Sequence, residues 1–504
     1  MQPPSENLPG STNPGGQLAH GFKRTLFGFS PSFKKNSSDD KYGYLFANAL
    51  GTPFTSDHRD LLEKLGRSMV DVTSAENPSE FSAIDAGYTY FGQFVDHDLT
   101  LDVDSVLDNL QDAKRLTNYR TPNLDLDAVY GDGPAVSPFM YDAEHVELVV
   151  GSMGNEFDLP RTLAGTAIIG DPRNDENLFV AQLHMSMLRF HNAVVDELRR
   201  QLPGLSASEL FQRAQTEVRR HYQWVVVHDF LRTIVGADMI NDVLDNGLKY
   251  FSQKKFRKFF MPVEFSVAAY RFGHSQIRNL YRFNRNFTNA DFFNAFGFTK
   301  SSVPGSWVVD WSGFFSEAGR EAANKARKID TRVAFSMGNL PTAPGTSPGS
   351  MFAILSARNL VRGMALGVPT GQAIAKRMKV RPLTREQLLS SPFASPTPEQ
   401  QMNHQQVVDL MQANNEFLVK QTPLWYYILK EAEVIQSGDQ LGPVGGRIIA
   451  EVFLRILADS KDSILGKEAV DWQPQFGLNG KDPADYRIVD MLRFAGTFKI
   501  PSVS

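Results

Sequence analysis

The chain has 504 residues, of which 42% are hydrophobic and 21% are charged, and its formal net charge is −4. This composition is ordinary for a globular protein with a large core, and the small acidic balance argues against nucleic acid or an anionic membrane as the main partner. The sequence contains no cysteine, which excludes disulfides, thiolate metal ligands and cysteine nucleophiles together.

The N-terminal segment, residues 1–21, is rich in Pro, Gly, Ser and Asn, and we expect it to be disordered. It lacks the basic stretch followed by an apolar run that marks a secretory signal peptide. No uninterrupted apolar stretch of the sequence is long enough to span a bilayer. We therefore expect a soluble protein without a visible signal peptide, and both cytoplasmic residence and leaderless secretion stay open.

The first strong helix signal covers residues 90–100. One face has the spacing of a buried apolar stripe: Phe91, Phe94 and Val95. A second face carries an amide, a carboxylate and an imidazole one turn apart: Gln93, Asp96 and His97. Asp98 is rotated by about 100° from His97 and points elsewhere. Burying such a polar face is costly unless each group has a partner, so the helix either carries a site or exposes this face to water.

Oxygen-bearing side chains occupy alternate positions in the next segment, residues 121–131: Thr121, Asn123, Asp125 and Asp127. Alternate residues of an extended or looped segment project to one side, and oxygen ligands suit a hard cation, calcium before magnesium. Asp98 is available as a further oxygen ligand for such a cation. If Asp98 were not available, we would interpret the segment as an ordinary acidic turn. The pattern does not match an EF-hand loop, which requires Gly at the sixth position and a distant Glu.

Residues 170–177 (GDPRNDEN) open a long helix that we expect to end near Pro203-Gly204. Two histidine pairs with i, i+7 spacing lie on this helix and on the following helical stretch: His184 with His191, and His221 with His228. Either pair is a candidate ligand set for a metal enzyme. Helical histidines among apolar neighbours are, however, more often packed and hydrogen-bonded, and zinc pairs prefer i, i+4 spacing.

Residues 265–284 are predicted to form a further helix, on which Arg271, His274 and Arg278 share one face. Gly273 has no side chain, so a flat and bulky group could approach beside His274.

Helices are also predicted towards the C-terminus. The first begins at about Met351, carries Asn359 and Arg362, and ends at Gly367–Pro369. Three more are expected over residues 402–418, 423–436 and 444–458. We predict a mainly α protein with few short strands. Residues 22–504 are expected to form one large domain, since no linker divides them into halves with independent motifs.

Five of these segments, in this order, resemble the motifs of the animal-type haem peroxidase family, also called the peroxidase–cyclooxygenase superfamily: residues 92–98, 121–131, 170–176, 271–274 and 359–369. Two C-terminal stretches, 441–447 and 492–496, resemble the bacterial branch of this family. The resemblance covers roughly residues 40–498, and it implies a single large helical haem peroxidase domain.

The resemblance implies catalytic roles for three residues of this chain. His97 matches the distal histidine, which takes a proton from bound hydrogen peroxide and returns it to the departing oxygen. Arg173 matches the distal arginine, whose positive charge stabilises the charge that develops as the O–O bond breaks. Gln93 matches the distal glutamine, which helps to hold water or a halide.

The resemblance also implies how haem b is held. His274 matches the proximal iron ligand, and Arg271 belongs to the same cofactor-binding motif. Asn359 matches the residue that accepts a hydrogen bond from the other nitrogen of that ligand, which fixes its tautomer. Asp96 and Glu176 match the two carboxylates that form ester links to the haem, and these links depend on prior turnover.

A calcium ion is implied as well, with its ligands in two segments of this chain: Asp98, Thr121, Asn123, Asp125 and Asp127. Thr121 and Asn123 would also contribute backbone oxygens. Because Asp98 adjoins His97, the ion would hold the distal helix in place, so its role would be structural.

Two departures from the family pattern affect the expected chemistry. Asn177 stands where a mammalian member has a methionine that forms a third, sulfonium link to the haem, so we expect that link to be absent. In the cyclooxygenase and fatty-acid dioxygenase branches, a radical-forming tyrosine lies three residues before the proximal histidine. Here Arg271 occupies this position and Tyr270 is one residue further away, which favours simple peroxidase chemistry.

The resemblance therefore implies a peroxidase that reduces hydrogen peroxide and oxidises a small donor through an oxoferryl intermediate. The donor would be a halide, thiocyanate or a phenol. The alternatives are a haem-dependent fatty-acid dioxygenase, a non-catalytic calcium-stabilised adhesion or matrix protein on the same fold, and a non-haem metal enzyme using the histidine pairs. The sequence does not set the oligomeric state.

Overall fold

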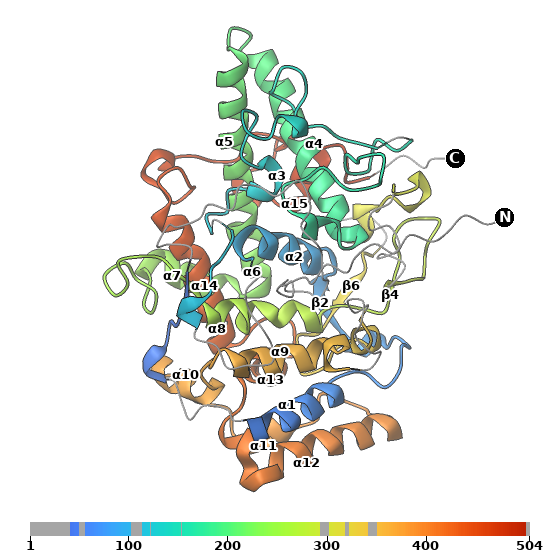
Figure 1. Ribbon diagram of the computed structural model, residues 1–504, viewed down its shortest axis with the longest axis vertical. Helices are drawn as coiled ribbons and strands as arrows, with labels where there is room; N and C mark the ends of the chain where they lie inside the picture. The colour runs from blue at the N-terminus through green and yellow to red at the C-terminus, as the bar shows by residue number, and fades with distance from the viewer. Residues whose placement is uncertain are drawn as a thin grey trace, which may run out of the picture.

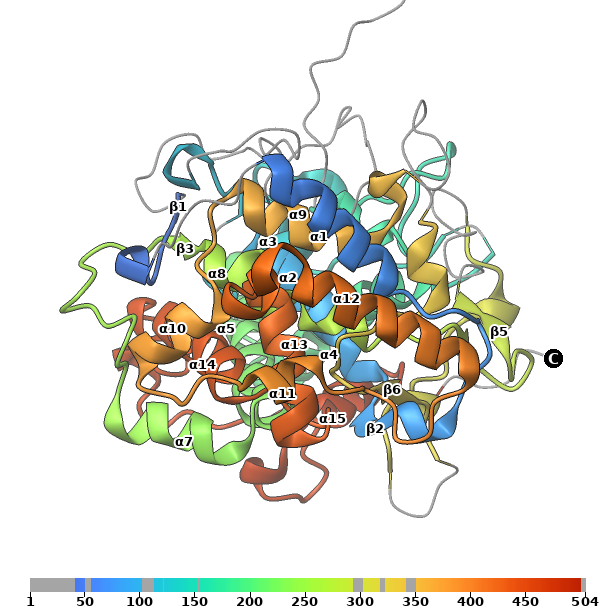
Figure 2. The same ribbon diagram turned by 90° about the horizontal axis from the view of Figure 1, so that it is seen from below.

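The computed structural model describes residues 41–49, 56–101, 113–120, 122–152, 154–292, 302–317, 322–340 and 350–499. Residues 1–21, which we expect to be disordered, lie outside this part of the chain. Helices dominate the described residues (Figures 1 and 2), which confirms the predicted mainly α fold class. The helices are α1 (Ser56–Ser68), α2 (Gly87–Leu99), α3 (Asp127–Tyr130), α4 (Leu178–Gln201), α5 (Ala207–Val225), α6 (Leu231–Ile234), α7 (Ala237–Asn246), α8 (Val263–Ser266), α9 (Leu355–Ala365), α10 (Gly371–Met378), α11 (Arg385–Leu389), α12 (Pro398–Lys420), α13 (Leu424–Gln436), α14 (Pro443–Asp459) and α15 (Ile488–Phe494).

The strands of the described residues are few and short, as predicted: β1 (Tyr42–Gly43), β2 (Phe81–Asp85), β3 (Met261–Pro262), β4 (Leu280–Tyr281), β5 (Ala290–Asp291) and β6 (Lys325–Arg327). Strand β1 pairs in parallel with β3, whereas β2 pairs with β6 and β4 with β5 in antiparallel register. The β1–β3 contact is reinforced by the buried Glu264 carboxylate, which accepts the backbone N–H groups of Leu45 (3.0 Å) and Phe46 (2.8 Å). The prediction of one domain over residues 22–504 stays a prediction.

Helix α2 lies at the centre of the molecule, with α4 and α5 on one side and α9 and α13 on the other (Figure 1). Its bounds match the predicted helix within a few residues, and its apolar stripe of Phe91, Phe94 and Val95 is fully buried. The polar face is buried too: His97 is inaccessible to solvent and Asp96 is 6% exposed. Each polar group on this face therefore requires a partner inside the protein.

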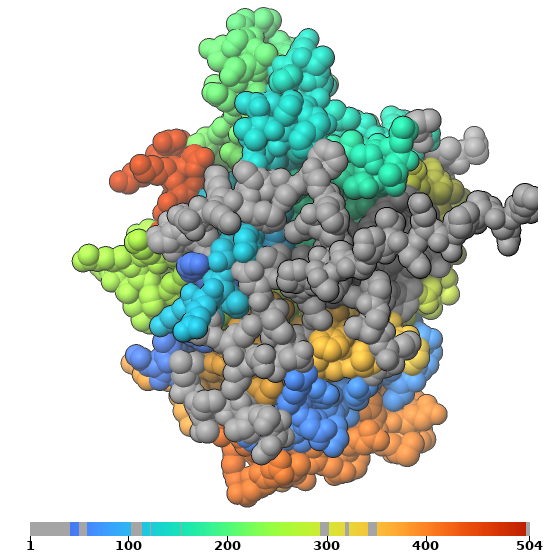
Figure 3. Space-filling view, in the orientation of Figure 1, coloured from blue at the N-terminus to red at the C-terminus, as the bar shows by residue number. Residues whose placement is uncertain are grey.

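Helices α4 and α5 form an antiparallel pair whose connecting turn lies at one end of the molecule, opposite α12 (Figures 1 and 3). Helix α4 begins at the side chain of Asn177, which accepts the backbone N–H of Val180 (3.1 Å), and it ends just before Pro203, as predicted. Helix α5 continues through a π-helical turn, Val226–Phe230, into α6. Such turns are frequent at functional sites.

The predicted helix over residues 265–284 is wrong. The chain instead forms the short helix α8, a 3-10 helix at Ala269–Ser275, and strand β4. Distant side chains determine this path: Glu76 pairs with Arg278 (2.8 Å) and accepts the backbone N–H of Asn279 (2.7 Å). These buried bonds use groups that a continuous helix would bond internally, so tertiary contacts override the helical pattern.

The predicted C-terminal helices are present. Helix α9 follows a 3-10 turn at Met351–Ala353 and ends before Gly367, which adopts a left-handed conformation (φ +59°) suited to glycine. Helices α12, α13 and α14 overlap the predicted ranges, with an interruption of α12 at residues 413–416. Figure 2 shows α12 beside α1, which in turn packs on α9. None of the described helices is long and apolar enough to cross a membrane.

Candidate functional site

A cavity lies between helix α2 and the 3-10 helix Ala269–Ser275. It encloses about 850 Å³ of space free of protein atoms, part of it open to solvent. Five of the predicted site residues line it: Gln93, Asp96, Glu176, Arg271 and His274. The sequence places these residues on three separate segments, and the fold brings them to one cavity.

His97 lies just behind the wall that α2 contributes. Its Nδ1 is 2.7 Å from Asn174 Oδ1, so Nδ1–H donates to this oxygen and Nε2 carries the lone pair. The Nε2 atom faces Glu176 Oε1 at 3.8 Å, and the Gln93 amide donates to this same oxygen. Because Gln93 and Glu176 line the cavity while His97 is fully buried, these two side chains separate His97 from the cavity.

Arg173 is held by a buried carboxylate. Asp171, which is inaccessible to solvent, accepts hydrogen bonds from Arg173 Nε (3.1 Å) and Nη2 (2.7 Å) and from its backbone N–H (2.9 Å). Arg173 Nη2 also donates to the backbone carbonyl of His97 (2.9 Å). Burial and, next, the Arg173 charge lower the pKa of His97 to about 4, so its imidazole is neutral at pH 7.

Asn174 is the functional residue that the sequence did not point to. Its Oδ1 bonds His97, and its Nδ2 lies 2.9 Å from Nδ1 of His184, so it joins two fully buried imidazoles. Burial lowers the pKa of His184 to about 3. Asn174 lies 77 residues from His97 in the chain, and its position directly after Arg173 was the only signal in the sequence.

On the opposite wall, the 3-10 helix presents His274. Its Nδ1 lies 2.7 Å from Nδ2 of Asn359, which projects from α9. The two ends of a side-chain amide are interchangeable by a 180° rotation, which would bring its oxygen to this place. Nδ1–H would then donate to Asn359, and the lone pair of Nε2 would be available to a metal. Burial and, next, the charge of Arg271 lower the pKa of His274 well below its usual range, which keeps the imidazole neutral.

Arg271 connects the two walls of the cavity. Its Nη1 lies 3.6 Å from Asp96 Oδ2, while its Nε donates to the backbone carbonyl of Ser266 (2.8 Å). The other oxygen of Asp96 accepts the hydroxyl of Thr100 (3.0 Å). Asp96 and Arg271 therefore hold α2 and the 3-10 helix together beside His274.

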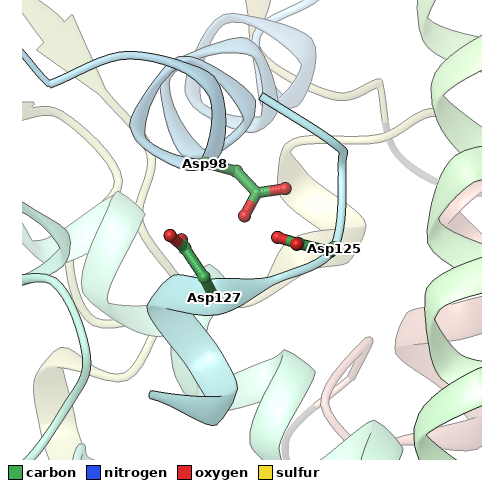
Figure 4. A group of neighbouring side chains, drawn as sticks. All are labelled: Asp98, Asp125 and Asp127. Carbon is green, nitrogen blue, oxygen red and sulfur yellow. The ribbon is translucent and has the colours of Figure 1, made fainter. Parts of the chain in front are cut away.

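An acidic cluster lies directly behind α2. Asp98 projects from the end of α2 toward Asp125 and Asp127 (Figure 4), and one carboxylate oxygen from each lies within 4.8 Å of the others. The backbone turns through two leucines in the left-handed conformation, Leu124 (φ 52°) and Leu126 (φ 58°). This conformation is costly for residues other than Gly, Asn and Asp, and it aims both loop aspartates at Asp98.

The acidic cluster is joined to the distal residues by Arg120. Its guanidinium forms ion pairs with Asp127 (3.1 Å) and Asp171 (2.6 Å). Arg120 therefore links the acidic cluster to Asp171, the carboxylate that holds Arg173. Burial and, next, the neighbouring acids raise the pKa of Asp98 well above its usual range, and burial raises that of Asp127 to about 6. The cluster thus disfavours its full negative charge in the absence of a cation.

The two other predicted calcium ligands, Asn123 and Thr121, are not part of this group of three carboxylates. Asn123 lies on the same loop and is half-buried, two residues before Asp125. Thr121 lies outside the described residues. Of the two conformations expected for this segment, extended or looped, the structure has a loop with left-handed turns, followed by helix α3, which begins at Asp127.

Neither histidine pair forms a metal site. Both ring nitrogens of His191 and of His221 make hydrogen bonds to other parts of the protein. His184 bonds an asparagine, and His228 stacks on a tryptophan at 4.0 Å between ring centroids. Within the part of the chain that the structure describes, one group of three or more side chains of the metal-binding type converges: Asp98, Asp125 and Asp127.

The chain is similar in sequence to known peroxidases over part of its length. The family model for animal haem peroxidases matches residues 107–460. Eosinophil peroxidase from Mus musculus is 30% identical over 111 residues, which make up 22% of this chain but only 15% of that relative. The match therefore covers a small part of the length of the curated relative.

Two solved structures share the fold over nearly the whole chain. Peroxidase A from Dictyostelium discoideum superposes with a TM-score of 0.60 at 15% identity, covering 88% of this chain and 90% of that one. A fatty acid alpha-dioxygenase from Arabidopsis thaliana superposes with a TM-score of 0.59 at 14% identity, covering 90% of this chain and 80% of that one. Given the family-model match over well over half of its length, this chain belongs to the animal haem peroxidase family.

Proposed function

We propose that the protein is a haem peroxidase that reduces hydrogen peroxide and oxidises a small donor, namely a halide, thiocyanate or a phenol. The observation that carries this proposal is the placement of three side chains around one cavity. His97, with a fixed tautomer, and Arg173 lie behind one wall, and His274 with its amide partner lies on the opposite wall.

The residues around the cavity suit the haem that the family implies. A Cβ added to Gly273 would have no atom within 4 Å, so the space beside His274 is open. Two carboxylates, Asp96 and Glu176, line the wall opposite His274. His274 would ligate the iron through Nε2, with Asn359 holding its other nitrogen. Once bound, the haem would supply the iron at which the O–O bond of hydrogen peroxide is cleaved.

On the distal side, His97 acts as a base and then as an acid. Its Nδ1 proton is held by Asn174, so Nε2 can accept a proton from peroxide and return it to the leaving oxygen. The Arg173 guanidinium stabilises the negative charge that develops on this oxygen. Glu176 stands between His97 Nε2 and the cavity, so peroxide can reach the imidazole only after this side chain moves.

Glu176 and Asp96 are the residues that we propose to form ester links with the haem. Both carboxylates line the cavity. Asn177 cannot form the sulfonium link, because it has no sulfur; its side chain begins helix α4 and donates to Gln93 Oε1 (3.2 Å). Asn177 thereby helps to orient Gln93.

We further propose that calcium occupies the acidic cluster and has a structural role. Carboxylate oxygens suit this hard cation, and the cation would neutralise the mutual repulsion of Asp98, Asp125 and Asp127. Since Asp98 ends the helix that carries His97, the ion would fix the end of that helix.

A fatty-acid dioxygenase is the second candidate, and the fold it shares with the Arabidopsis dioxygenase is the observation in its favour. Three residues before His274, where a radical-forming tyrosine would be expected in that branch, Arg271 bonds Asp96 instead. Oxygen uptake with linoleate in the absence of peroxide would favour the dioxygenase.

Two substitutions test the proposed function. In His97→Leu we expect haem to bind normally, while the rate of reaction with peroxide, followed at the Soret band, falls by about 10²–10⁴-fold because the general base is lost. His274→Ala should instead weaken haem binding. Peroxide reactivity that is unchanged in His97→Leu, or normal iron ligation in His274→Ala, would contradict the assignment.

A further inference from the structure

Three tyrosines line the cavity: Tyr88, Tyr90 and Tyr270. Tyr90 faces the phenol of Tyr281, and the hydroxyl groups of the other two have different partners. The hydroxyl of Tyr88 donates to Asp229 Oδ1 at 2.6 Å. The hydroxyl of Tyr270 donates to the backbone carbonyl of Gly92 at 3.2 Å. Both rings are more than nine-tenths buried. They therefore share the same cavity but differ in whether the acceptor is able to take up a proton.

The acceptor of Tyr88 is a fixed, buried carboxylate. Asp229 is 5% exposed and lies in the π-helical turn Val226–Phe230 between α5 and α6. Its second oxygen accepts the backbone N–H of Ile488 at 2.9 Å. Burial raises the pKa of the Asp229 carboxyl to about 6, against the opposing hydrogen bond of Tyr88. Asp229 has no role in the proposed peroxide chemistry.

Removing an electron from a phenol makes its hydroxyl a far stronger acid, so the electron leaves readily only if the proton can leave with it. A carboxylate within hydrogen-bonding distance accepts that proton without any movement of heavy atoms. A backbone carbonyl cannot accept it. Of the three tyrosines on the cavity wall, Tyr88 is the one whose hydroxyl donates to a carboxylate, which can take up its proton.

We propose that Tyr88 and Asp229 form a redox pair in the cavity wall, in which Tyr88 gives one electron to the site oxidised by hydrogen peroxide and its phenolic proton passes to Asp229. The proposal rests on the proposed peroxidase function, which supplies the oxidant. The O–H bond of Tyr88 breaks, an O–H bond forms on Asp229, and the oxidised site is reduced by one electron.

The pair is restored by the donor substrate. A phenol that enters the cavity gives one electron to the tyrosyl radical, and the proton returns from Asp229 to the oxygen of Tyr88. The oxidised donor releases its own proton to solvent, so charge and atoms balance over the cycle. Tyr88 thus stores one oxidising equivalent on the cavity wall during the interval between the reactions of two one-electron donors.

Electron paramagnetic resonance of the full-length, haem-loaded protein, frozen shortly after adding hydrogen peroxide, tests the proposal. We expect a tyrosyl signal that narrows when the protein is made with ring-deuterated tyrosine. The signal should be lost in Tyr88→Phe and should fall several-fold in Asp229→Asn. Tyr270→Phe, the matched control that removes a hydroxyl from the same cavity, should keep the signal.

Two results would overturn the pair: no tyrosyl signal in the wild type, or a signal of equal size in Tyr88→Phe. A signal lost equally in Tyr270→Phe and Tyr88→Phe would also overturn it. Tyr88→Phe removes a single hydroxyl, so this variant decides the question even if Asp229→Asn does not fold. The Soret band of the wild type distinguishes failure of this proposal from failure of the proposed peroxidase function. A band that responds to peroxide without a tyrosyl signal would contradict the Tyr88–Asp229 pair alone. A band that does not respond would contradict both the pair and the peroxidase function.

Discussion

Replacing Asp171 by Asn tests whether this buried carboxylate positions Arg173 for reaction with peroxide. Asp171 is inaccessible to solvent and accepts three hydrogen bonds from Arg173 and one from Arg120. An amide keeps the size of the side chain but removes its charge and directs N–H groups at a guanidinium. The buried Arg173 then loses the carboxylate that compensates its charge, and Arg120 retains its ion pair with Asp127.

The cost follows from the burial of these charges. Breaking a buried ion pair by removing one partner destabilises a protein by about 3–5 kcal/mol. With an unfolding entropy of about 2 cal/mol/K per residue, a chain of 504 residues loses about 1 °C of Tm for each kcal/mol. We therefore expect the Tm of Asp171→Asn to fall by about 3–5 °C. Misplacing the guanidinium of Arg173 should slow the reaction with peroxide by about 10²-fold.

Asp175→Asn is the matched control. Asp175 ends the 3-10 helix Pro172–Asp175, on which Arg173 also lies, and it forms a buried ion pair with Arg161 (2.8 Å). We expect a similar loss of Tm and a rate of reaction with peroxide close to that of the wild type, both measured on haem-loaded protein by calorimetry and by stopped-flow absorbance at the Soret band. A wild-type rate in Asp171→Asn, or equal losses of rate in both variants, would refute the positioning role.

The pH dependence of this effect has a definite sign. Burial alone raises the pKa of the Asp171 carboxyl, but Arg120 and Arg173 together hold it well below its usual range. A carboxyl with a lowered folded-state pKa contributes stability that is present above its unfolded pKa, about 4, and lost as the pH falls through the folded value. The difference in unfolding free energy between wild type and Asp171→Asn should therefore be constant from about pH 5 to about pH 8 and shrink below about pH 4.

Three further predictions concern the other parts of the site. Asn359→Leu removes the partner of His274 Nδ1, and haem titration should show binding at least about tenfold weaker; unchanged affinity would speak against His274 as the ligand. Chelation by EGTA of calcium present at about 100 times its Kd should remove about 2.7 kcal/mol of stability and lower the Tm by about 3 °C. Asp98→Asn should show little of this response, and a full response would rule out the acidic cluster as the calcium site. After turnover with peroxide, peptide mass spectrometry should find haem attached at Glu176 in the wild type; an adduct at the same position in Glu176→Gln would contradict the ester assignment.

Much of the fold could be predicted because its helices have regular apolar stripes and clear ends. Helix α2 matches the prediction because Phe91, Phe94 and Val95 bury one face, and α4 because Asn177 and Pro203 mark its limits. These signals are local, so a single sequence is enough to read them.

The errors occur where contacts between distant residues decide the structure. The segment around Arg278 was predicted as helix, but Glu76, 202 residues away, binds it in a non-helical conformation. The left-handed conformations of Leu124 and Leu126 are unexpected for leucine, so the pattern of alternate acidic residues indicated an extended or looped segment but not these turns. Asn174 has no local feature that places it between His97 and His184, since that contact exists only in the folded chain.

The central claim is that the cavity holds a haem that reacts with hydrogen peroxide. The most direct test is the absorption spectrum of the purified, haem-supplied protein before and after one equivalent of hydrogen peroxide. The account predicts a Soret band that bleaches or shifts on adding peroxide and recovers when a phenolic or halide donor follows. A Soret band that peroxide leaves unmoved, or no Soret band at all, would contradict it.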